Sequence, residues 1–304
     1  MFAQKLNKAI QEKNSRVCVG LDPRLEWLPK QITQKAVHQH GKTFAAAASA
    51  IAEFNKQVID TIAPFAPAVK PQIAFYEQYG PDGLIAFKQT IDYAHSLGLQ
   101  VIVDAKRGDI DSTAQAYANS LLGKTDLFGQ EHTCYGVDCL TVNPFLGEDS
   151  LLPFINTCKK YDTGIFILVK TSNPGSSDLQ DLVIAGQTIA EKLASLVAQH
   201  AQDQIGADGY SNIGAVVGAT FPDEAKLLRE KMPHSIFLVP GIGSQGGKTD
   251  NIRNFFNTDG LGAIINSSRG IVFSQLGNSR DDYLQKIEKE VKKLRKEIND
   301  QLGK

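Results

Sequence analysis

The chain has 304 residues, 42% of them hydrophobic and 21% charged, and its net charge is −1. These values are typical of a globular protein with a substantial core, built as one large domain or two smaller ones. The near-neutral charge and the lack of a long basic run argue against a nucleic-acid or anionic-membrane partner. The sequence contains no run of about 18 apolar residues, which a membrane-spanning helix would need. Residues 1–10 lack the apolar core of a signal peptide. We therefore expect a cytoplasmic protein.

The four cysteines form no CxxC pair, and Cys18 and Cys139 lie inside apolar runs. With Cys134 and Cys158, they are predicted to be buried thiols rather than disulfides or zinc ligands.

The first hundred residues alternate between predicted helices and strands. Residues 2–14 carry apolar positions at helical spacing and predict a short leading helix. A strand at 16–23 contains Asp22 near its end. Residues 30–42 are polar and irregular, and the two histidines there lack a third metal ligand, so we expect a solvated insertion. An alanine-rich helix at 44–62 comes next.

The strand at 66–73 carries Lys70 immediately before a proline, where extended backbone is favoured. The predicted elements after it are helix 81–97, the strand that begins at 101, helix 110–122, strand 137–143, helix 149–160, strand 164–170, helix 178–205, strand 213–218, helix 222–231, strand 235–240, helix 247–257 and strand 261–266.

Eight strands that alternate with helices over about 250 residues match a closed (β/α)8 TIM barrel better than an open doubly wound sheet. The strands are continuous apolar runs, as in buried parallel sheets, and no Gly-rich dinucleotide fingerprint follows the first strand. We predict a single α/β barrel domain over residues 1–304. In residues 281–302 the spacing of apolar residues resembles a coiled-coil seam, but a long final helix that covers the barrel explains it without a partner.

The third strand and its loop contain the densest set of charges. Asp104 and Lys106 are two residues apart and should point to the same side of the strand, and Asp109 follows the turn at Gly108. Opposite charges a few ångströms apart keep one another ionised, and burying such a set is costly. A salt-bridged strand end and a catalytic array are both open interpretations of this stretch.

Ionisable residues recur at the ends of other predicted strands. In a TIM barrel the working residues lie at this carboxyl-terminal face, so Asp22, Lys70 and Arg269 should converge with the third-strand charges. The loop at 240–247 is rich in glycine and opens a helix, which suits an anion, and the guanidinium of Arg269 could grip phosphate oxygens in bidentate fashion. Residues 170–175 supply hydroxyl and amide groups.

Together, Lys70, the Asp-Ala-Lys-Arg-Gly-Asp-Ile motif at 104–110, Ser-Asn-Pro-Gly at 172–175, the 240–247 loop and Arg269 resemble the orotidine 5′-phosphate decarboxylase family. The long loops and the Lys-Arg-Gly of the motif look like its larger bacterial subfamily. The resemblance covers nearly the whole barrel. It implies removal of carbon dioxide from orotidine 5′-monophosphate to give UMP, the last step of de novo pyrimidine synthesis, without metal or organic cofactor.

The resemblance also implies roles for individual residues. Lys106 would donate the proton to the ring carbon that loses the carboxylate, within a Lys-Asp-Lys-Asp network. The implied catalytic residues are Lys70, Asp104, Lys106 and Asp109. The implied substrate-binding residues are Asp22, with Lys70, for the ribose; Ser172 for the ring; Pro240, Gln245, Gly246 and Arg269 on the phosphate side; and Thr113. In the family Asp109 and Thr113 reach the neighbouring subunit's site, which implies a homodimer with shared active sites.

Two alternatives stay open. A sister enzyme of the hexulose-phosphate synthase kind shares an Asp-x-Lys-x-x-Asp motif but uses magnesium, and Lys70 stands where a metal site would need a carboxylate. A nucleotide sensor without turnover is the other alternative, and the charged array speaks against it.

Overall fold

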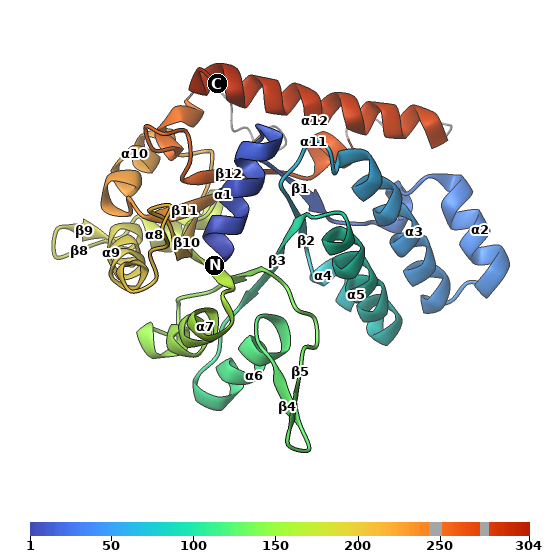
Figure 1. The fold of residues 1–304 in the computed structure, drawn as a ribbon, viewed down its shortest axis with the longest axis horizontal. Coiled ribbons are helices and arrows are strands. Elements are labelled where there is room, and N and C mark those ends of the chain that lie inside the picture. Colours follow the sequence, from blue (N-terminus) through green and yellow to red (C-terminus); the bar gives the residue numbers. More distant parts are fainter. Residues whose placement is uncertain (243–250, 274–279) are drawn as a thin grey trace.

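Eight parallel strands close into a barrel in the computed structural model, which describes residues 1–242, 251–273 and 280–304 (Figure 1). The strands are β1 (Val17–Leu21), β2 (Ala68–Pro71), β3 (Gln100–Arg107), β6 (Cys139–Val142), β7 (Gly164–Lys170), β10 (Ser211–Val217), β11 (Ser235–Val239) and β12 (Ala263–Ser267). Each pairs with its chain neighbour, and β12 pairs with β1 to complete the circle. The predicted TIM barrel is confirmed.

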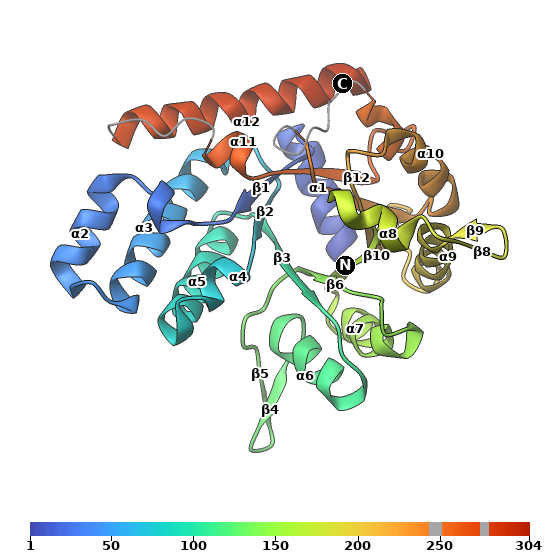
Figure 2. The same ribbon diagram turned by 180° about the vertical axis from the view of Figure 1, so that it is seen from behind.

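Helices surround the barrel and cover one of its ends (Figures 1 and 2). They are α1 (Phe2–Lys13), α2 (Lys30–His40), α3 (Phe44–Ile62), α4 (Ala74–Glu77), α5 (Gly80–Ser96), α6 (Asp111–Leu121), α7 (Glu148–Tyr161), α8 (Ser177–Gln180), α9 (Ile189–Gln202), α10 (Pro222–Lys231), α11 (Arg269–Val272) and α12 (Arg280–Leu302), with the 3-10 turns η1 (Leu25–Trp27), η2 (Pro174–Ser176) and η3 (Ile252–Phe255). None of the helices in the described part of the chain has the length and apolar composition needed to cross a bilayer.

The leading helix α1 closes the amino-terminal end of the barrel. Phe2, Leu6 and Ile10 join the cluster of inward-facing strand residues, and the Phe2 ring meets Phe166 of β7 edge-on at 6.1 Å. Figure 1 shows α1 crossing the strands at this end. The opposite end of the barrel is therefore the one available for a site.

The final helix α12 lies along the outside of the barrel, as predicted. Its apolar positions Ile287, Val291 and Ile298 are buried, while its other positions carry lysine–carboxylate pairs such as Lys286 with Asp282. The side chain of Asn299 is tied to Arg16, next to β1, by a 3.0 Å hydrogen bond.

The prediction of an irregular insertion at 30–42 is wrong, because these residues form helix α2. Ile32 and Ala36 are four residues apart and are both buried, so one face of α2 can pack on α3. Gly41, at a φ of 68°, ends the helix in a conformation that suits glycine.

The prediction of one helix over 178–205 is also wrong. The segment contains α8, a hairpin of β8 (Val183–Ile184) and β9 (Gln187–Thr188), and then α9. Ala185 and Gly186 have φ values of 53° and 82°, which no helix allows, and Thr188 restarts the helix with a capping box to Glu191.

Three smaller differences concern local features. A second hairpin, β4 (Thr125–Leu127) with β5 (Gln130–His132), was not predicted. Part of the predicted helix at 247–257 lies outside the described residues, and the described part contains η3. Three cysteines are buried free thiols as predicted, but Cys134 is exposed.

Candidate active site

The carboxyl-terminal ends of the strands surround a cavity of about 890 Å³. Side chains alternate along a strand, so every strand, or the residue directly after it, turns at least one side chain into this space, and eight of these residues, one for each strand, show its character. Five of these residues are polar and three are apolar. The polar ones are Asp22, Lys70, Asp104, Thr141 and Asn266, and the apolar ones are Leu168, Val216 and Leu238. The cavity therefore has a charged side and an apolar side.

Asp104 lies at the centre of the charged side, between two ammonium groups. Its Oδ2 is 2.9 Å from Nζ of Lys70, and its Oδ1 is 2.6 Å from Nζ of Lys106. Lys70 is 5% exposed at its side chain, whereas Lys106 is 46% exposed and borders the cavity. One ammonium is thus locked in place, and the other is presented to a ligand.

The environment keeps Asp104 and Lys70 ionised. Burial would raise the pKa of the Asp104 carboxyl, but Lys70 and Lys106 together lower it far below its usual range. Burial would likewise lower the pKa of the Lys70 ammonium, but Asp104 and then Asp22 raise it above its usual range. The array has the charge pattern of a preorganised electrostatic site.

Thr141 of β6 supports the array through three hydrogen bonds to β3. Its hydroxyl accepts hydrogen bonds from the amides of Ala105 (3.0 Å) and Lys106 (2.9 Å) and donates one to Oδ1 of Asp104 (3.0 Å). Lys106 has a φ of 47°, uncommon for a residue other than glycine, so its backbone needs such support. Thr141 was not among the predicted site residues, because its contacts depend on how β6 is aligned with β3.

Two residues that line the cavity each have a buried side-chain oxygen without a partner. Among the described residues, neither Oδ1 of Asp22 nor Oδ1 of Asn266 has a hydrogen-bond partner. Buried polar atoms are nearly always paired, so two unpaired oxygens in side chains that line one cavity mark its wall as unusual.

Arg269, the first residue of α11, borders the cavity beside β12. The turn before it packs tightly on β1, because a Cβ on Gly20 would lie 1.8 Å from Oγ of Ser268. Pro240 lines the same side, and the predicted residues Gln245 and Gly246 lie outside the described residues.

The comparisons with known proteins agree with this arrangement. Residues 15–280 match the model of the Orotidine 5′-phosphate decarboxylase / HUMPS family. The chain belongs to that family. It is 48% identical over 273 residues to the orotidine 5′-phosphate decarboxylase of Rhodopirellula baltica, covering 90% of this chain and 88% of that protein.

Two further relatives extend the match to nearly the whole chain. The orotidine 5′-phosphate decarboxylase of Caldicellulosiruptor bescii is 37% identical over 298 residues, 98% of each chain. The solved structure of Leishmania donovani OMP decarboxylase is 33% identical with a TM-score of 0.75 and covers 100% of this chain and 99% of that one. Within the family, the enzyme class is thus that of the carboxy-lyases that form UMP from orotidine 5′-monophosphate in pyrimidine biosynthesis. Assignment to its larger bacterial subfamily stays a prediction.

Two residues expected in the decarboxylase site lie apart from the cavity. The Asp109 carboxylate accepts a 2.8 Å hydrogen bond from the amide of Ile110, and in the described part of the chain it forms no ion pair with Lys106. Thr113, in the first turn of α6, is exposed. Within this chain, the expected four-residue network therefore consists of Lys70, Asp104 and Lys106 only.

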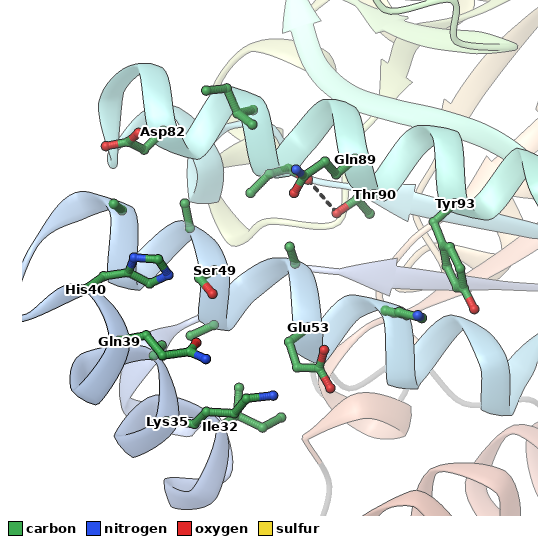
Figure 3. Close-up of a pocket in the computed structure, with 18 residues that line it drawn as sticks. Ile32, Lys35, Gln39, His40, Ser49, Glu53, Asp82, Gln89, Thr90 and Tyr93 are labelled. Atoms are coloured by element: carbon green, nitrogen blue, oxygen red, sulfur yellow. Dashed lines mark hydrogen bonds between the residues drawn. The ribbon is translucent and has the colours of Figure 1, made fainter.

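A second cavity, of about 490 Å³, lies on the outside of the barrel between α2, α3 and α5 (Figure 3). His40, from the segment considered for metal binding, is at its edge, and Glu53 and Asp82 come from the neighbouring helices. Active sites of this fold lie at the carboxyl ends of the strands, so the first cavity is the candidate active site.

Proposed function

We propose that the chain decarboxylates orotidine 5′-monophosphate with Lys106 as the proton donor. The observation that carries this proposal is the Lys70–Asp104–Lys106 array, which presents one exposed ammonium group at a cavity large enough for a nucleotide. Asp104 would lie beside the departing carboxylate.

The chemistry explains why a cation must already be in place. When the bond between the ring carbon and the carboxylate breaks, carbon dioxide leaves and the electron pair stays on the ring carbon. No electron sink on the ring stabilises that pair, so a nearby fixed charge has to do so. Nζ of Lys106 would then transfer a proton to the carbon and recover one from water.

The rest of the nucleotide would be held around the array. Asp22, with Lys70, suits the ribose hydroxyls, and Ser172 on the wall beside the apolar side suits the ring. Arg269 suits the phosphate, with Pro240 and the undescribed Gln245 and Gly246 near it. Binding energy from the remote phosphate can be used to position the ring.

We also propose a homodimer with shared active sites. Asp109 and Thr113 do not line the cavity of their own chain, and the neighbouring Ile110 is 49% exposed. This arrangement is the one expected if these residues complete the site of a second copy.

Three broader expectations belong to the same proposal. The reaction would use no metal or organic cofactor, because Lys106 itself supplies the proton. Residues 1–304 would form one domain, since α1 and α12 both pack on the barrel. A cytoplasmic location would fit the three buried free thiols.

The deciding experiment is UV absorbance of the purified protein with orotidine 5′-monophosphate after EDTA treatment. We expect metal-free conversion to UMP. Binding without conversion would instead support a nucleotide sensor. Conversion that stops with EDTA and returns with magnesium would contradict the cofactor-free mechanism, and absent binding would direct the search to sugar phosphates.

A further inference from the structure

The segment at 171–182, between β7 and α9, forms one wall of the active-site cavity. Ser172, Asn173 and Leu179 are among its lining residues. Figure 2 shows α8, which belongs to this segment, in front of the strands at the carboxyl-terminal end of the barrel. The position of Ser172 therefore depends on how this segment is held.

Behind the segment lies a buried lysine that the proposed mechanism does not use. Lys170, the last residue of β7, has a side chain with no exposed surface. Its ammonium group forms ion pairs with Asp181 and, at 3.3 Å, with Oε2 of Glu224, and lies 4.2 Å from the centre of the Phe221 ring. Lys170 is not among the residues that line the cavity.

The contacts of Lys170 join two parts of the barrel. Asp181 lies at the far end of the segment, and Glu224 lies in the first turn of α10. Because an isolated buried ammonium is very costly, both carboxylates are needed close to it. A methionine would fill the same space without this cost, so packing alone does not account for a lysine here.

Two other contacts show that the segment is held as a closed loop. The amide of Thr171 donates to Oε1 of Gln180, and Nε2 of Gln180 donates to Oγ1 of Thr171, both at 2.9 Å. Ser172 packs directly against Gly218, because a Cβ added to Gly218 would lie 2.9 Å from the Ser172 backbone. A shift of Asp181 would therefore be transmitted to Ser172.

We infer that Lys170 is a positioning residue for substrate recognition. By tying Asp181 to Glu224 it holds the 171–182 segment against Gly218, so that Ser172 faces the pyrimidine ring. This inference rests on the proposed function, because that function assigns the ring to Ser172.

The test compares two ligands that differ in the ring. UMP carries ribose, phosphate and pyrimidine, whereas ribose 5-phosphate lacks the pyrimidine. The variants are Asp181→Asn, which keeps the size of a half-exposed side chain, and Lys170→Met. Lys231→Met is the matched control, since Lys231 on α10 pairs with Glu191 at 3.6 Å and not with the segment. Binding is measured by calorimetry.

We expect Asp181→Asn and Lys170→Met to weaken UMP binding about tenfold, the usual effect of losing one charged hydrogen bond, and to change ribose 5-phosphate binding less than about twofold. Lys231→Met should change neither. Equal weakening of both ligands, or unchanged UMP binding, would overturn the inference. If Lys170→Met does not fold, Asp181→Asn decides alone. Wild-type conversion of orotidine 5′-monophosphate is measured in parallel, so failure of the proposed function is recognised separately.

Discussion

Nζ of Lys106 lies 2.6 Å from Oδ1 of Asp104, two residues earlier on the same strand, and the hydroxyl of Thr141 contacts both that oxygen and the Lys106 amide. At the open end of the barrel, Asp104 thus holds the ammonium group of Lys106, and Thr141 holds its backbone amide. Such a group loses little freedom when a substrate arrives, which is the condition for electrostatic preorganisation.

Removing the proposed proton donor should abolish turnover but not binding. For Lys106→Ala we expect the turnover number to fall by at least about 100- to 10,000-fold, the usual range for loss of a general acid, with UMP affinity nearly unchanged. Stopped-flow absorbance and calorimetry measure the two quantities. Lys160→Ala removes a surface lysine paired with Glu131 and should leave both unchanged. Substantial residual turnover would remove Lys106 from its proposed role.

Thr141→Val should reduce both stability and turnover. The valine keeps the shape but removes the hydroxyl that pairs with two amides and with the Asp104 carboxylate, which keeps only its two lysines, so we expect a loss of about 1–3 kcal/mol in the free energy of unfolding and a lower turnover number. Urea unfolding and initial rates measure these. Thr157→Val on α7 removes another buried hydroxyl, which donates to Pro153, and should lower stability alone. Equal kinetics in the two variants would contradict the supporting role of Thr141.

The stability contributed by Lys70 and Asp104 should depend on pH at both extremes. The folded-state pKa of Asp104 is lowered, so its contribution is complete above its ordinary pKa of about 3.9 and is lost as the pH falls through the folded value. The pKa of Lys70 is raised, so its contribution is complete below about 10.4 and is lost as the pH rises through the folded value.

Lys70→Met tests this dependence. The difference in free energy of unfolding between wild type and variant should be constant from about pH 5 to 9 and shrink below about pH 4, as urea unfolding can measure. Lys56→Met, which removes an exposed lysine over the Tyr93 ring, should show no such change. A difference that persists to the lowest pH would mean that Lys70 does not hold Asp104 ionised.

Arg269→Ala should weaken binding more than it slows chemistry. Loss of a charged contact to the phosphate should raise the Michaelis constant about 10- to 100-fold. Binding of uridine, which lacks the phosphate, should be unaffected in a calorimetric comparison with UMP. Arg253→Ala, an exposed arginine in η3, is the control. An unchanged Michaelis constant would count against the phosphate role.

Mixing two inactive variants tests the shared sites. If Asp109 acts in the neighbouring subunit, unfolding and refolding Asp109→Ala together with Lys106→Ala should restore about a quarter of wild-type activity, because half of the dimers are mixed and each has one intact site. Asp104 and Lys106 belong to the same site of one chain. A mixed dimer of Asp104→Ala and Lys106→Ala therefore carries one change in each of its two sites and should restore nothing. Equal results for the two mixtures would contradict subunit sharing.

The barrel and its charged array could be predicted because short-range rules decide them. Apolar runs define each strand, and alternation predicts that Asp104 and Lys106 share a side, but the irregular backbone at Lys106, with a φ of 47°, could not be predicted. Thr141 was missed because its role depends on the register between β3 and β6, which a single sequence does not contain.

Other errors arose where tertiary packing or one turn outweighs composition. The polar segment at 30–42 becomes helical because Ile32 and Ala36 pack on α3, and the predicted long helix is interrupted by the turn at Ala185–Gly186. The distance between Asp109 and Lys106 could not be predicted either, because a loop of three residues can turn in more than one direction.

The pairing of β1 with β12 also has a consequence for synthesis on the ribosome. Val17 pairs with Ile265, so the first strand made must wait for nearly all the chain to be translated before it finds its neighbour. Until then Asp22 and Arg269 cannot face one cavity, and nucleotide cannot assist the folding of the nascent chain. A premature stop before β12 would leave β1 and β11 as open strand edges, available for pairing with other chains.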